Sequence, residues 1–332
     1  MAAEPGLNME DVARLFAPLD GAKHVLLAVS GGADSTALMV MAADWSRGRT
    51  TKFTAATVDH GLRAESKAEA KAVGKLAKSL GIPHRILTWE GDKPEAGLEE
   101  TARNARYELL EGLATKVGAT HLVTAHTQDD QAETVLMRLA AGSGPAGLAG
   151  MRIASKRGAL VHVRPLLGTP KSRLIALLQE RGIAWNEDAM NADARFARPR
   201  LRAARAVLEN EGLTSERLAT LAGRMARMND TLDRVASAAW PEAVREDNGK
   251  TVLDGTVLLS LPEEIGLRLL VRAVGGHADQ TPDRLAKNEA LFAAVRGALQ
   301  KGQQIGRTLA GAKIAVKGGT VTVSPAPPRR AG

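Results

Sequence analysis

Short apolar runs alternate with longer helical patterns through the first half of the chain. The apolar runs predict strands at 24–30, 52–58, 84–89 and 121–125. Apolar residues at helical spacing between them predict helices at 35–45, 67–80, 98–117 and 129–141. This alternation is typical of an α/β fold with a doubly wound parallel sheet, whose ligands bind at the carboxyl ends of the strands. We therefore expect the active site where Ser30, Asp59 and His126 follow their strands.

Beyond residue 141 the pattern changes to glycine-rich turns and longer helical stretches. Segment 142–150 is too rich in glycine for regular structure. The pattern then predicts a strand at 161–163, helices at 171–181, 200–244 and 281–300, and a terminal β meander of strands at 306–309, 313–316 and 320–323. We therefore expect a domain over residues 1–205, a smaller and mostly helical domain over 206–324 that ends in the meander, and a disordered tail over 325–332.

Composition excludes several classes of protein. The chain has 332 residues, and no apolar run in it approaches the roughly 20 residues that a membrane helix needs. Acidic residues precede the first apolar stretch, which is the wrong charge order for a secretory signal, so we expect a cytoplasmic protein that does not enter a membrane. With 0 cysteines, the chain cannot form disulfides, thiolate metal sites or intermediates that carry sulfur on a protein thiol.

Positive charge is concentrated in the second part of the chain. Residues 1–190 hold 23 basic and 22 acidic side chains, whereas residues 191–332 hold 22 and 15, a net charge of +7. This asymmetry favours a polyanionic partner that docks on the second part. Aromatic residues make up 3% of the chain and Tyr107 is its single tyrosine, so a nucleic acid would be held by arginine, backbone and shape instead of base stacking.

The strongest local signal is the segment SGGADS at 30–35, between a predicted strand and a predicted helix. Its two glycines allow backbone N–H groups to approach an anion closely, and the helix that follows presents its positive end. Asp34 would repel a phosphate unless a cation lies between them. A glycine turn with a serine cap is the alternative. We favour a phosphate-binding loop, and the spacing fits neither a Walker loop nor a dinucleotide fingerprint.

A cluster of carboxylates follows the fourth predicted strand. Asp129, Asp130 and Glu133 fall in the first turn of the next helix, where Asp130 and Glu133 share a face. Acidic residues in a first turn often do no more than pair with the helix dipole. Asp34, at the end of a neighbouring strand, changes this interpretation, because carboxylates that converge beside a phosphate loop suit Mg²⁺.

Four segments together resemble a known family. The loop SGGADS resembles that of the PP-loop ATPases, which cleave ATP between its α- and β-phosphates and adenylate a substrate. VDHGLR at 58–63, TAHTQDDQAET at 124–134 and the glycines of 142–151 narrow the match. With them the chain is similar to the tRNA(Ile)-lysidine synthetase family, well over residues 24–202 and weakly beyond.

The resemblance implies roles for particular residues. It implies ATP binding at Ser30, Gly31, Gly32, Ala33, Asp34, Ser35, Val58 and His60. It associates Asp34 and Asp130 with ATP and its Mg²⁺ ion, and His126 with the nucleotide. We take Asp34, Arg106, His126, Asp130 and Glu133 as the candidate catalytic residues. The family often has a second histidine where Thr127 stands, so no role is assigned to that position.

Arginines form two further candidate groups. Arg106 lies on the predicted helix 98–117 beside Arg103 and Tyr107; a solvated face is the alternative, but the family has a similar arginine-bearing helix that faces substrate. Five arginines fall within eleven residues, at Arg195, Arg198, Arg200, Arg202 and Arg205. Planar guanidinium groups suit phosphates, so we expect these five to bind the tRNA backbone or the triphosphate. A charged hinge helix is the alternative, and Pro199 departs from the family pattern by replacing its usual asparagine.

The resemblance implies an ATP-dependent ligase. Such an enzyme joins the ε-amine of free L-lysine to C2 of the wobble cytidine in the tRNA(Ile) with a CAU anticodon, through an adenylated cytidine, and releases AMP and pyrophosphate. Transfer of sulfur to tRNA is an alternative that the lack of cysteine weakens. Amidating synthetases of small molecules and a nucleotide-binding regulator without chemistry are two others. The oligomeric state is left open, with a homodimer as one alternative.

Overall fold

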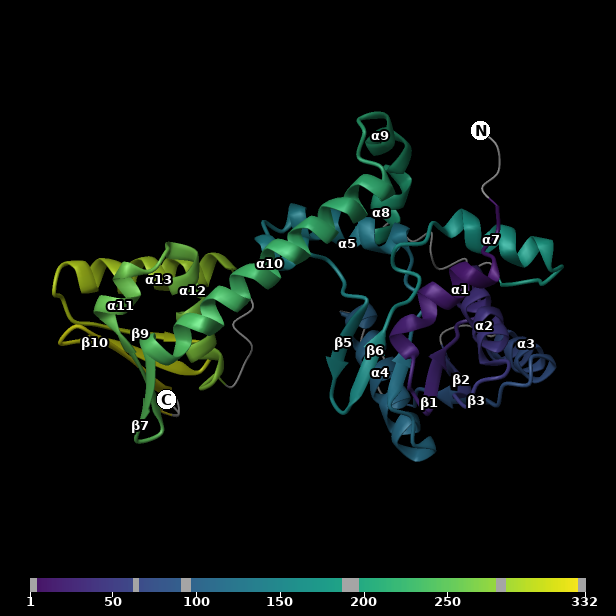
Figure 1. Cartoon of the computed structure of the whole chain (residues 1–332), viewed down its shortest axis with the longest axis horizontal. Helices are drawn as coiled ribbons and strands as arrows, with labels where there is room; N and C mark the ends of the chain where they lie inside the picture. The colour runs from purple at the N-terminus through teal and green to yellow at the C-terminus, as the bar shows by residue number, and fades with distance from the viewer. Residues whose placement is uncertain (1–4, 62–65, 91–96, 187–196, 279–284, 328–332) are drawn as a thin grey trace. The chain divides into compact units, whose positions relative to one another are not determined.

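The computed structural model describes residues 5–61, 66–90, 97–186, 197–278 and 285–327. The chain divides into two compact units (Figure 1). The first unit comprises Met1–Ala141 and Gly150–Ala222, and the second comprises Gly142–Ala149 and Gly223–Gly332. The division therefore falls inside a helix, after residue 222. The sequence places a boundary after residue 205, and its assignment of functional domains stays a prediction.

The first unit is built on a six-stranded sheet in the order β3-β2-β1-β4-β6-β5. Its strands are β1 (His24–Ala28), β2 (Lys52–Asp59), β3 (His84–Thr88), β4 (His121–Val123), β5 (Ala154–Arg157) and β6 (Leu160–Val163). All neighbouring strands run parallel except β5, which pairs antiparallel with β6. The predicted α/β class and parallel sheet are confirmed. The edge strand β5 was not predicted, because its residues Ser155, Lys156 and Arg157 are polar.

The central strand β1 is buried on both faces of the sheet, which explains why its sequence is a continuous apolar run. Val25 and Leu27 face one hydrophobic cluster, whereas Leu26 and Ala28 face another. The first cluster is covered by α1 (Met9–Phe16), α2 (Ala33–Ser46), α3 (Ser66–Ser79) and α7 (Lys171–Glu180), and the second by α4 (Leu98–Val117). Helices on both faces complete a doubly wound unit.

The segments around α5 (Gln128–Ala140) correct two expectations. Residues 142–150 were predicted to lack regular structure, but they contain the short helix α6 (Pro145–Leu148), because Pro145 in its first turn presets a helical φ. The predicted helical run 200–244 is divided into α8 (Ala197–Ala203), α9 (Arg205–Asn210) and α10 (Ser215–Ala243). Gly212, at φ +81°, ends α9. Leu218 and Ala222 of α10 then pack against α5.

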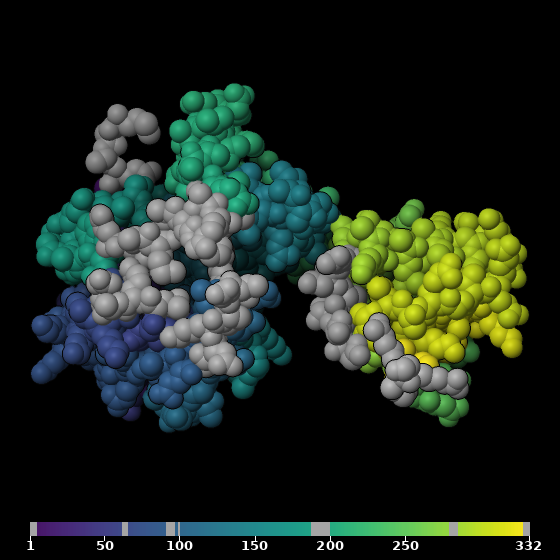
Figure 2. Space-filling model, turned by 180° about the vertical axis from the view of Figure 1, so that it is seen from behind, coloured from purple at the N-terminus to yellow at the C-terminus, as the bar shows by residue number. Residues whose placement is uncertain are grey.

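The second unit contains a five-stranded antiparallel sheet in the order β7-β8-β11-β10-β9. Its strands are β7 (Val244–Asp247), β8 (Lys250–Asp254), β9 (Ile305–Leu309), β10 (Ala312–Lys317) and β11 (Thr320–Pro325). Helices α11 (Gly255–Ser260), α12 (Glu263–Gly275) and α13 (Leu285–Gln300) lie on one face of this sheet (Figure 1). Seen from behind in Figure 2, the last strands (yellow) and these helices (yellow-green) form separate parts of the unit's surface.

Some predictions for this second unit need correction. The predicted three-stranded meander is part of a larger sheet, because β8 pairs with β11 and β7 pairs with β8. The predicted tail begins inside β11, where Pro325 pairs with Ala312, and residues 328–332 lie outside the described residues. The first four residues of the predicted helix 281–300 also lie outside them. Within the described ranges, no helix combines the length and the apolar character that crossing a membrane requires.

Candidate active site

The strand order places a crevice at the carboxyl ends of β1 and β4. From β1 the sheet extends to β2 and β3 on one side and to β4 and β6 on the other, so the loops after β1 and β4 diverge. A cleft of about 560 Å³ lies there. Its wall includes Ser30, Gly32, Ala33, Asp34 and Ser35 after β1, Thr124, His126 and Asp130 after β4, and Arg106, Lys171, Trp185, Asn186 and Arg202. An adjoining pocket of about 240 Å³ is bordered by Val58, Asp59 and His60 and again by Ser30 and Arg106.

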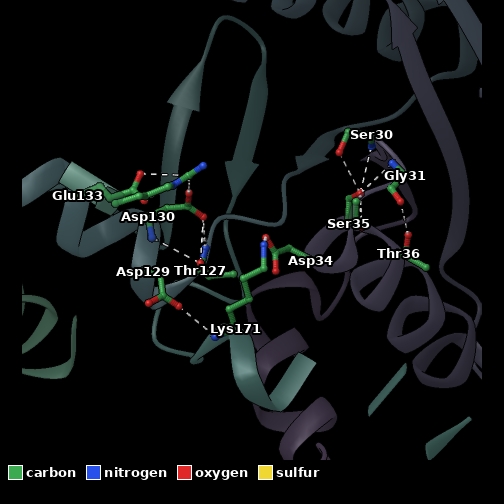
Figure 3. Close-up of polar contacts among 12 residues, drawn as sticks. Ser30, Gly31, Asp34, Ser35, Thr36, Thr127, Asp129, Asp130, Glu133 and Lys171 are labelled. Atoms are coloured by element: carbon green, nitrogen blue, oxygen red, sulfur yellow. Dashed lines mark hydrogen bonds and ion pairs between the residues drawn. The ribbon is translucent and has the colours of Figure 1, made fainter. Parts of the chain in front are cut away.

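The SGGADS loop owes its shape to the Ser35 hydroxyl. This oxygen accepts hydrogen bonds from the backbone N–H groups of Ser30 and Gly31, each at 3.1 Å, and donates to the carbonyl of Gly32 at 3.1 Å (Figure 3). The side chain is buried. Ser35 therefore stabilises the loop from its buried side. The residues of the first turn of α2, whose N–H groups lack partners inside the helix, line the cleft.

Gly31 holds the one position in this loop that excludes a side chain. Its φ of +94° is a left-handed conformation, and a Cβ there would lie 2.8 Å from Nδ2 of Asn186 and 3.0 Å from Val73. The carbonyl of Gly31 also accepts a hydrogen bond from the backbone N–H of Asn186 at 2.9 Å. The chain at 185–186 thus lies directly against the loop, which explains why Trp185 and Asn186 line the cleft.

Replacing Gly31 with alanine is expected to lower the free energy of unfolding by about 1–2 kcal/mol, the cost of a left-handed conformation for a residue with a Cβ. Gly32→Ala is the matched control, because Gly32 has an extended backbone with a φ of −71° and its Cβ would meet no atom closer than 3.9 Å. Urea unfolding of both variants measures the difference. Equal destabilisation of the two would contradict this account of the loop.

Asp34 enters the cleft from the first turn of α2. Its Oδ2 accepts a hydrogen bond from Nζ of Lys171 at 3.2 Å, while its Oδ1 is buried and has no hydrogen-bond partner in the described part of the chain (Figure 3). Burial raises the pKa of Asp34 above its usual value; Lys171 opposes this shift, and the charge of Asp130 adds to it. A buried carboxylate oxygen without a partner suits a bound cation.

Asp130 and Thr127 together cap the start of α5. Oδ2 of Asp130 accepts from the backbone N–H of Thr127 at 2.8 Å and from its hydroxyl at 3.0 Å, while the Thr127 oxygen accepts from the backbone N–H of Asp130. This is a capping box, which gives Thr127 a structural role. Asp130 lines the cleft, and its Oδ1 lies 3.8 Å from the guanidinium of Arg202. Asp130 therefore caps the helix with Oδ2, while Oδ1 is not used by the cap.

Two arginines tie the segment after residue 197 to α5. Arg202 lines the cleft and donates from Nε to Oε1 of the buried Glu133 at 2.5 Å and from NH2 to its Oε2 at 3.2 Å. Arg205 lies 2.6 Å from Asp129, which also accepts from the Ser215 hydroxyl at 2.9 Å. Arg202 thus lies at the cleft wall, whereas Arg205 pairs with Asp129 and Glu209 and does not line the cleft, so the assignment of both arginines to tRNA or phosphate stays a prediction. Arg200 is exposed, while Arg195 and the side chain of Arg198 lie outside the described residues.

Arg106 is the cation best placed to meet a ligand. It projects from α4 to the border of both pockets, and no carboxylate or hydrogen-bond partner for it occurs among the residues that the structure describes. Burial lowers the pKa of its guanidinium, and Tyr107 opposes that shift, but an arginine remains charged at neutral pH. A half-buried guanidinium that has no carboxylate partner among the described residues is expected to bind an anion.

The cleft brings together most of the residues singled out from the sequence. Val58 and His60 line the adjoining pocket, where the His60 ring packs edge-on against Trp89 at 5.9 Å. Glu133 lies behind the cleft wall, where it holds Arg202. The sequence did not point to Lys171 or Asn186 as site residues. A lysine that follows Thr169-Pro170 looks like an ordinary helix start, and only the fold brings it to Asp34.

The chain resembles known proteins over a domain and over its full length. Residues 7–209 match the family model of the PP-loop domain. The tRNA(Ile)-lysidine synthase of Methylobacterium sp. (strain 4-46) is 48% identical over 99% of this chain and 97% of its own length. That of Rhodopseudomonas palustris (strain ATCC BAA-98 / CGA009) is 46% identical over 98% of this chain and 96% of its own length.

A solved structure shares the fold. The U34-tRNA thiolase NcsA from Methanococcus maripaludis, which carries a 4Fe-4S cluster, has a TM-score of 0.57 and covers 65% of this chain and 77% of its own. The two sequences are 17% identical, so the likeness concerns the fold alone. The crevice described above lies in the part of the chain that the PP-loop model matches.

Proposed function

The chain belongs to the tRNA(Ile)-lysidine synthase family and carries its PP-loop domain, and from that premise we propose that it is an ATP-dependent ligase that joins L-lysine to tRNA(Ile). The ε-amine of lysine becomes bonded to C2 of the wobble cytidine in the tRNA that carries a CAU anticodon. The observation that carries this proposal is the relative that is 48% identical over 99% of the chain.

The proposed reaction has two steps. In the first, the C2 oxygen of the cytidine attacks the α-phosphorus of ATP, the bond to the β-phosphate breaks, and pyrophosphate leaves. In the second, the neutral ε-amine of lysine attacks C2, the C2–O bond breaks, and AMP leaves with that oxygen. The tRNA therefore gains one lysine less one water, and ATP yields AMP and pyrophosphate.

The cleft offers a place for each part of the nucleotide. The N–H groups at the start of α2 would hold the pyrophosphate that leaves, because the residues of this first turn line the cleft at the positive end of the helix. Arg106 and Lys171 would neutralise charge that develops on the phosphates, since both line the same wall. Val58 and His60, in the adjoining pocket, would contact the nucleoside.

The residues present fit a Mg²⁺ ion. Asp34 offers a buried oxygen that has no hydrogen-bond partner among the described residues, and Asp130, which lines the same cleft, offers Oδ1. The described side chains contain no group of three or more His, Asp or Glu that could hold a metal, so phosphate and water oxygens would complete the coordination, as is common for Mg²⁺. When bound, Mg²⁺ would stabilise negative charge on the phosphates during cleavage.

Lysine, tRNA and the cellular setting complete the proposal. Acidic side chains at the cleft would hold the lysine ammonium until it loses a proton and becomes a nucleophile. The second unit has 16 basic and 11 acidic side chains in residues 223–332, a net charge of +5 that suits an RNA backbone. Transfer of sulfur is excluded in the form that uses protein thiols, because the chain has 0 cysteines. A cytoplasmic location and a homodimer stay predictions.

The test is mass spectrometry of two tRNAs after incubation with ATP, Mg²⁺ and lysine. We expect tRNA(Ile) with a CAU anticodon to gain the mass of one lysine less one water, and tRNA(Met), which has the same anticodon, to remain unchanged. Ion-exchange chromatography of the nucleotides should show AMP and pyrophosphate. ADP as the nucleotide product would overturn the PP-loop assignment, and modification of neither tRNA by an ATP-binding protein would overturn the proposed substrate.

A further inference from the structure

A line of buried polar groups leads from the interior of the sheet to the cleft. Arg164 and His162 come from β6 and the residue following its end, and Thr124 and His126 follow β4, which pairs with β6. NH2 of Arg164 lies 3.0 Å from Nδ1 of His162, Nε2 of His162 lies 2.9 Å from Oγ1 of Thr124, and that oxygen lies 2.8 Å from Nδ1 of His126. His162 is 2% exposed and Thr124 is 1% exposed.

The first bond in this line fixes the tautomer of His162. A guanidinium can only donate, so Nδ1 of His162 must accept, and the neutral ring then carries its proton on Nε2. Burial, followed by the charge of Arg164, lowers the pKa of His162 to about 3, which keeps the ring neutral at physiological pH. Nε2–H of His162 therefore donates to the hydroxyl oxygen of Thr124.

The second bond directs the single proton of Thr124. The oxygen of this hydroxyl already accepts from His162, and His126 is its other hydrogen-bond partner among the residues that the structure describes. If Nδ1 of His126 carried a proton, both rings would donate to the oxygen and the hydroxyl proton would be buried without an acceptor, a costly arrangement. The hydroxyl therefore donates to Nδ1 of His126.

We propose that Arg164, His162 and Thr124 are positioning residues that hold His126 in its Nε2–H tautomer and so make it a hydrogen-bond donor at the cleft. The assignment of the acceptor rests on the proposed function: a phosphate oxygen of ATP accepts from such a donor. A ring held in this way donates through Nε2 and does not act as a general base at that atom. The role of His126 is therefore to bind and orient the nucleotide.

The surroundings hold the line of groups in place. NH1 of Arg164 also donates to the carbonyl of Arg152 at 3.0 Å and to the hydroxyl of Ser155 at 3.2 Å. The Tyr107 ring packs edge-on against His162 at 5.6 Å, and the Arg157 guanidinium covers Tyr107 at 3.9 Å. Arg164 thus cannot turn away from His162 without breaking two other hydrogen bonds. The edge strand β5, which has no place in the cleft wall, supports the site through these contacts.

The direct test is nitrogen NMR of the full chain with ¹⁵N-labelled histidine. Long-range ¹H–¹⁵N spectra distinguish Nε2–H from Nδ1–H rings, and the chain has 7 histidines, so the His126 signals can be assigned by their loss in His126→Gln. We expect Nε2–H for both His126 and His162. An Nδ1–H pattern for either ring in the unmodified protein would overturn the proposal without any variant.

Two variants of Thr124 test the consequence. Thr124→Val keeps the shape but removes the hydroxyl, and we expect mixed tautomers of His126 and a KM for ATP raised about tenfold, the scale of one lost hydrogen bond. Thr124→Ser keeps the hydroxyl and is expected to restore the single tautomer and a KM within about twofold of the original. The KM for tRNA should not change in either variant.

The outcomes separate this proposal from the proposed function. An unchanged His126 tautomer in Thr124→Val would overturn the positioning role even if the enzyme makes lysidine. Conversely, the expected spectra in a protein that does not modify tRNA would support the positioning role of Thr124 and His162 and overturn the proposed reaction. If Thr124→Val fails to fold, His162→Phe interrupts the same line two groups from His126, and an unchanged His126 spectrum there would equally overturn the positioning role.

Discussion

Replacing Asp34 with asparagine is expected to slow the formation of AMP at least about 100-fold, the scale of removing one positioned electrostatic group from an active site. Asparagine keeps the size of the side chain and its contact with Lys171 can persist through the amide oxygen. The substitution removes the charge on a buried oxygen that has no hydrogen-bond partner in the described chain, where the geometry suits a cation. Initial rates at saturating tRNA, lysine and Mg²⁺ measure the effect.

The other end of the same helix provides the control. Asp44 is a buried aspartate near the other end of α2, where it pairs with Arg181 at 2.5 Å and with Arg47 at 3.3 Å and does not line the cleft. Asp44→Asn makes the same chemical change and is expected to lower stability while the rate stays within about twofold, because the substitution removes no charge from the cleft. Equal rates for the two variants would remove Asp34 from the site.

The fold of the first unit follows from local patterns in the sequence. Strands such as β1 are apolar runs because both faces of the sheet are buried, and the segments between them carry apolar residues at helical spacing. The second unit was harder to predict. Asn248 and Gly249, with φ values of 47° and 72°, form the turn between β7 and β8. An Asn-Gly pair is typical of a β-hairpin, although no strand was predicted on either side of it. The pairing of β8 with β11 joins strands far apart in the chain, which no local pattern specifies.

The site shows the same division between local and long-range information. The SGGADS loop and the carboxylates of α5 are local motifs, so their place at the strand ends could be predicted. The contact of Lys171 with Asp34 joins residues 137 positions apart and depends on the packing of α7 against α2. Likewise, Arg202, which the sequence assigned to phosphate or tRNA, is paired with the carboxylate of Glu133, and this pairing depends on the fold. The sequence therefore gives the charge of a segment, whereas the ion-pair partners of its side chains depend on the fold.

A chain shortened after Ala222 is expected to bind ATP and to modify tRNA at least about 100-fold more slowly than the full chain, equivalent to about 2.8 kcal/mol of lost interaction. All residues of the three hydrophobic clusters of the first unit lie at or before Ala222, and Leu218 and Ala222 of α10 pack on α5. Every residue that lines the two pockets precedes residue 203. The deletion therefore removes a unit of net charge +5 and leaves the nucleotide cleft complete.

Three measurements make this result decisive. Thermal unfolding of the shortened chain establishes that it folds, calorimetric titration with ATP gives its nucleotide affinity, and tRNA binding at several salt concentrations gives the slope of log affinity against log salt. We expect a shallower slope than that of the full chain. Without the second unit, the protein makes fewer phosphate contacts, so tRNA binding releases fewer counterions. An unchanged slope together with full modification would place tRNA binding on the first unit. A loss of ATP affinity in a folded chain would instead mean that the cleft needs the second unit, although all the residues that line the cleft remain.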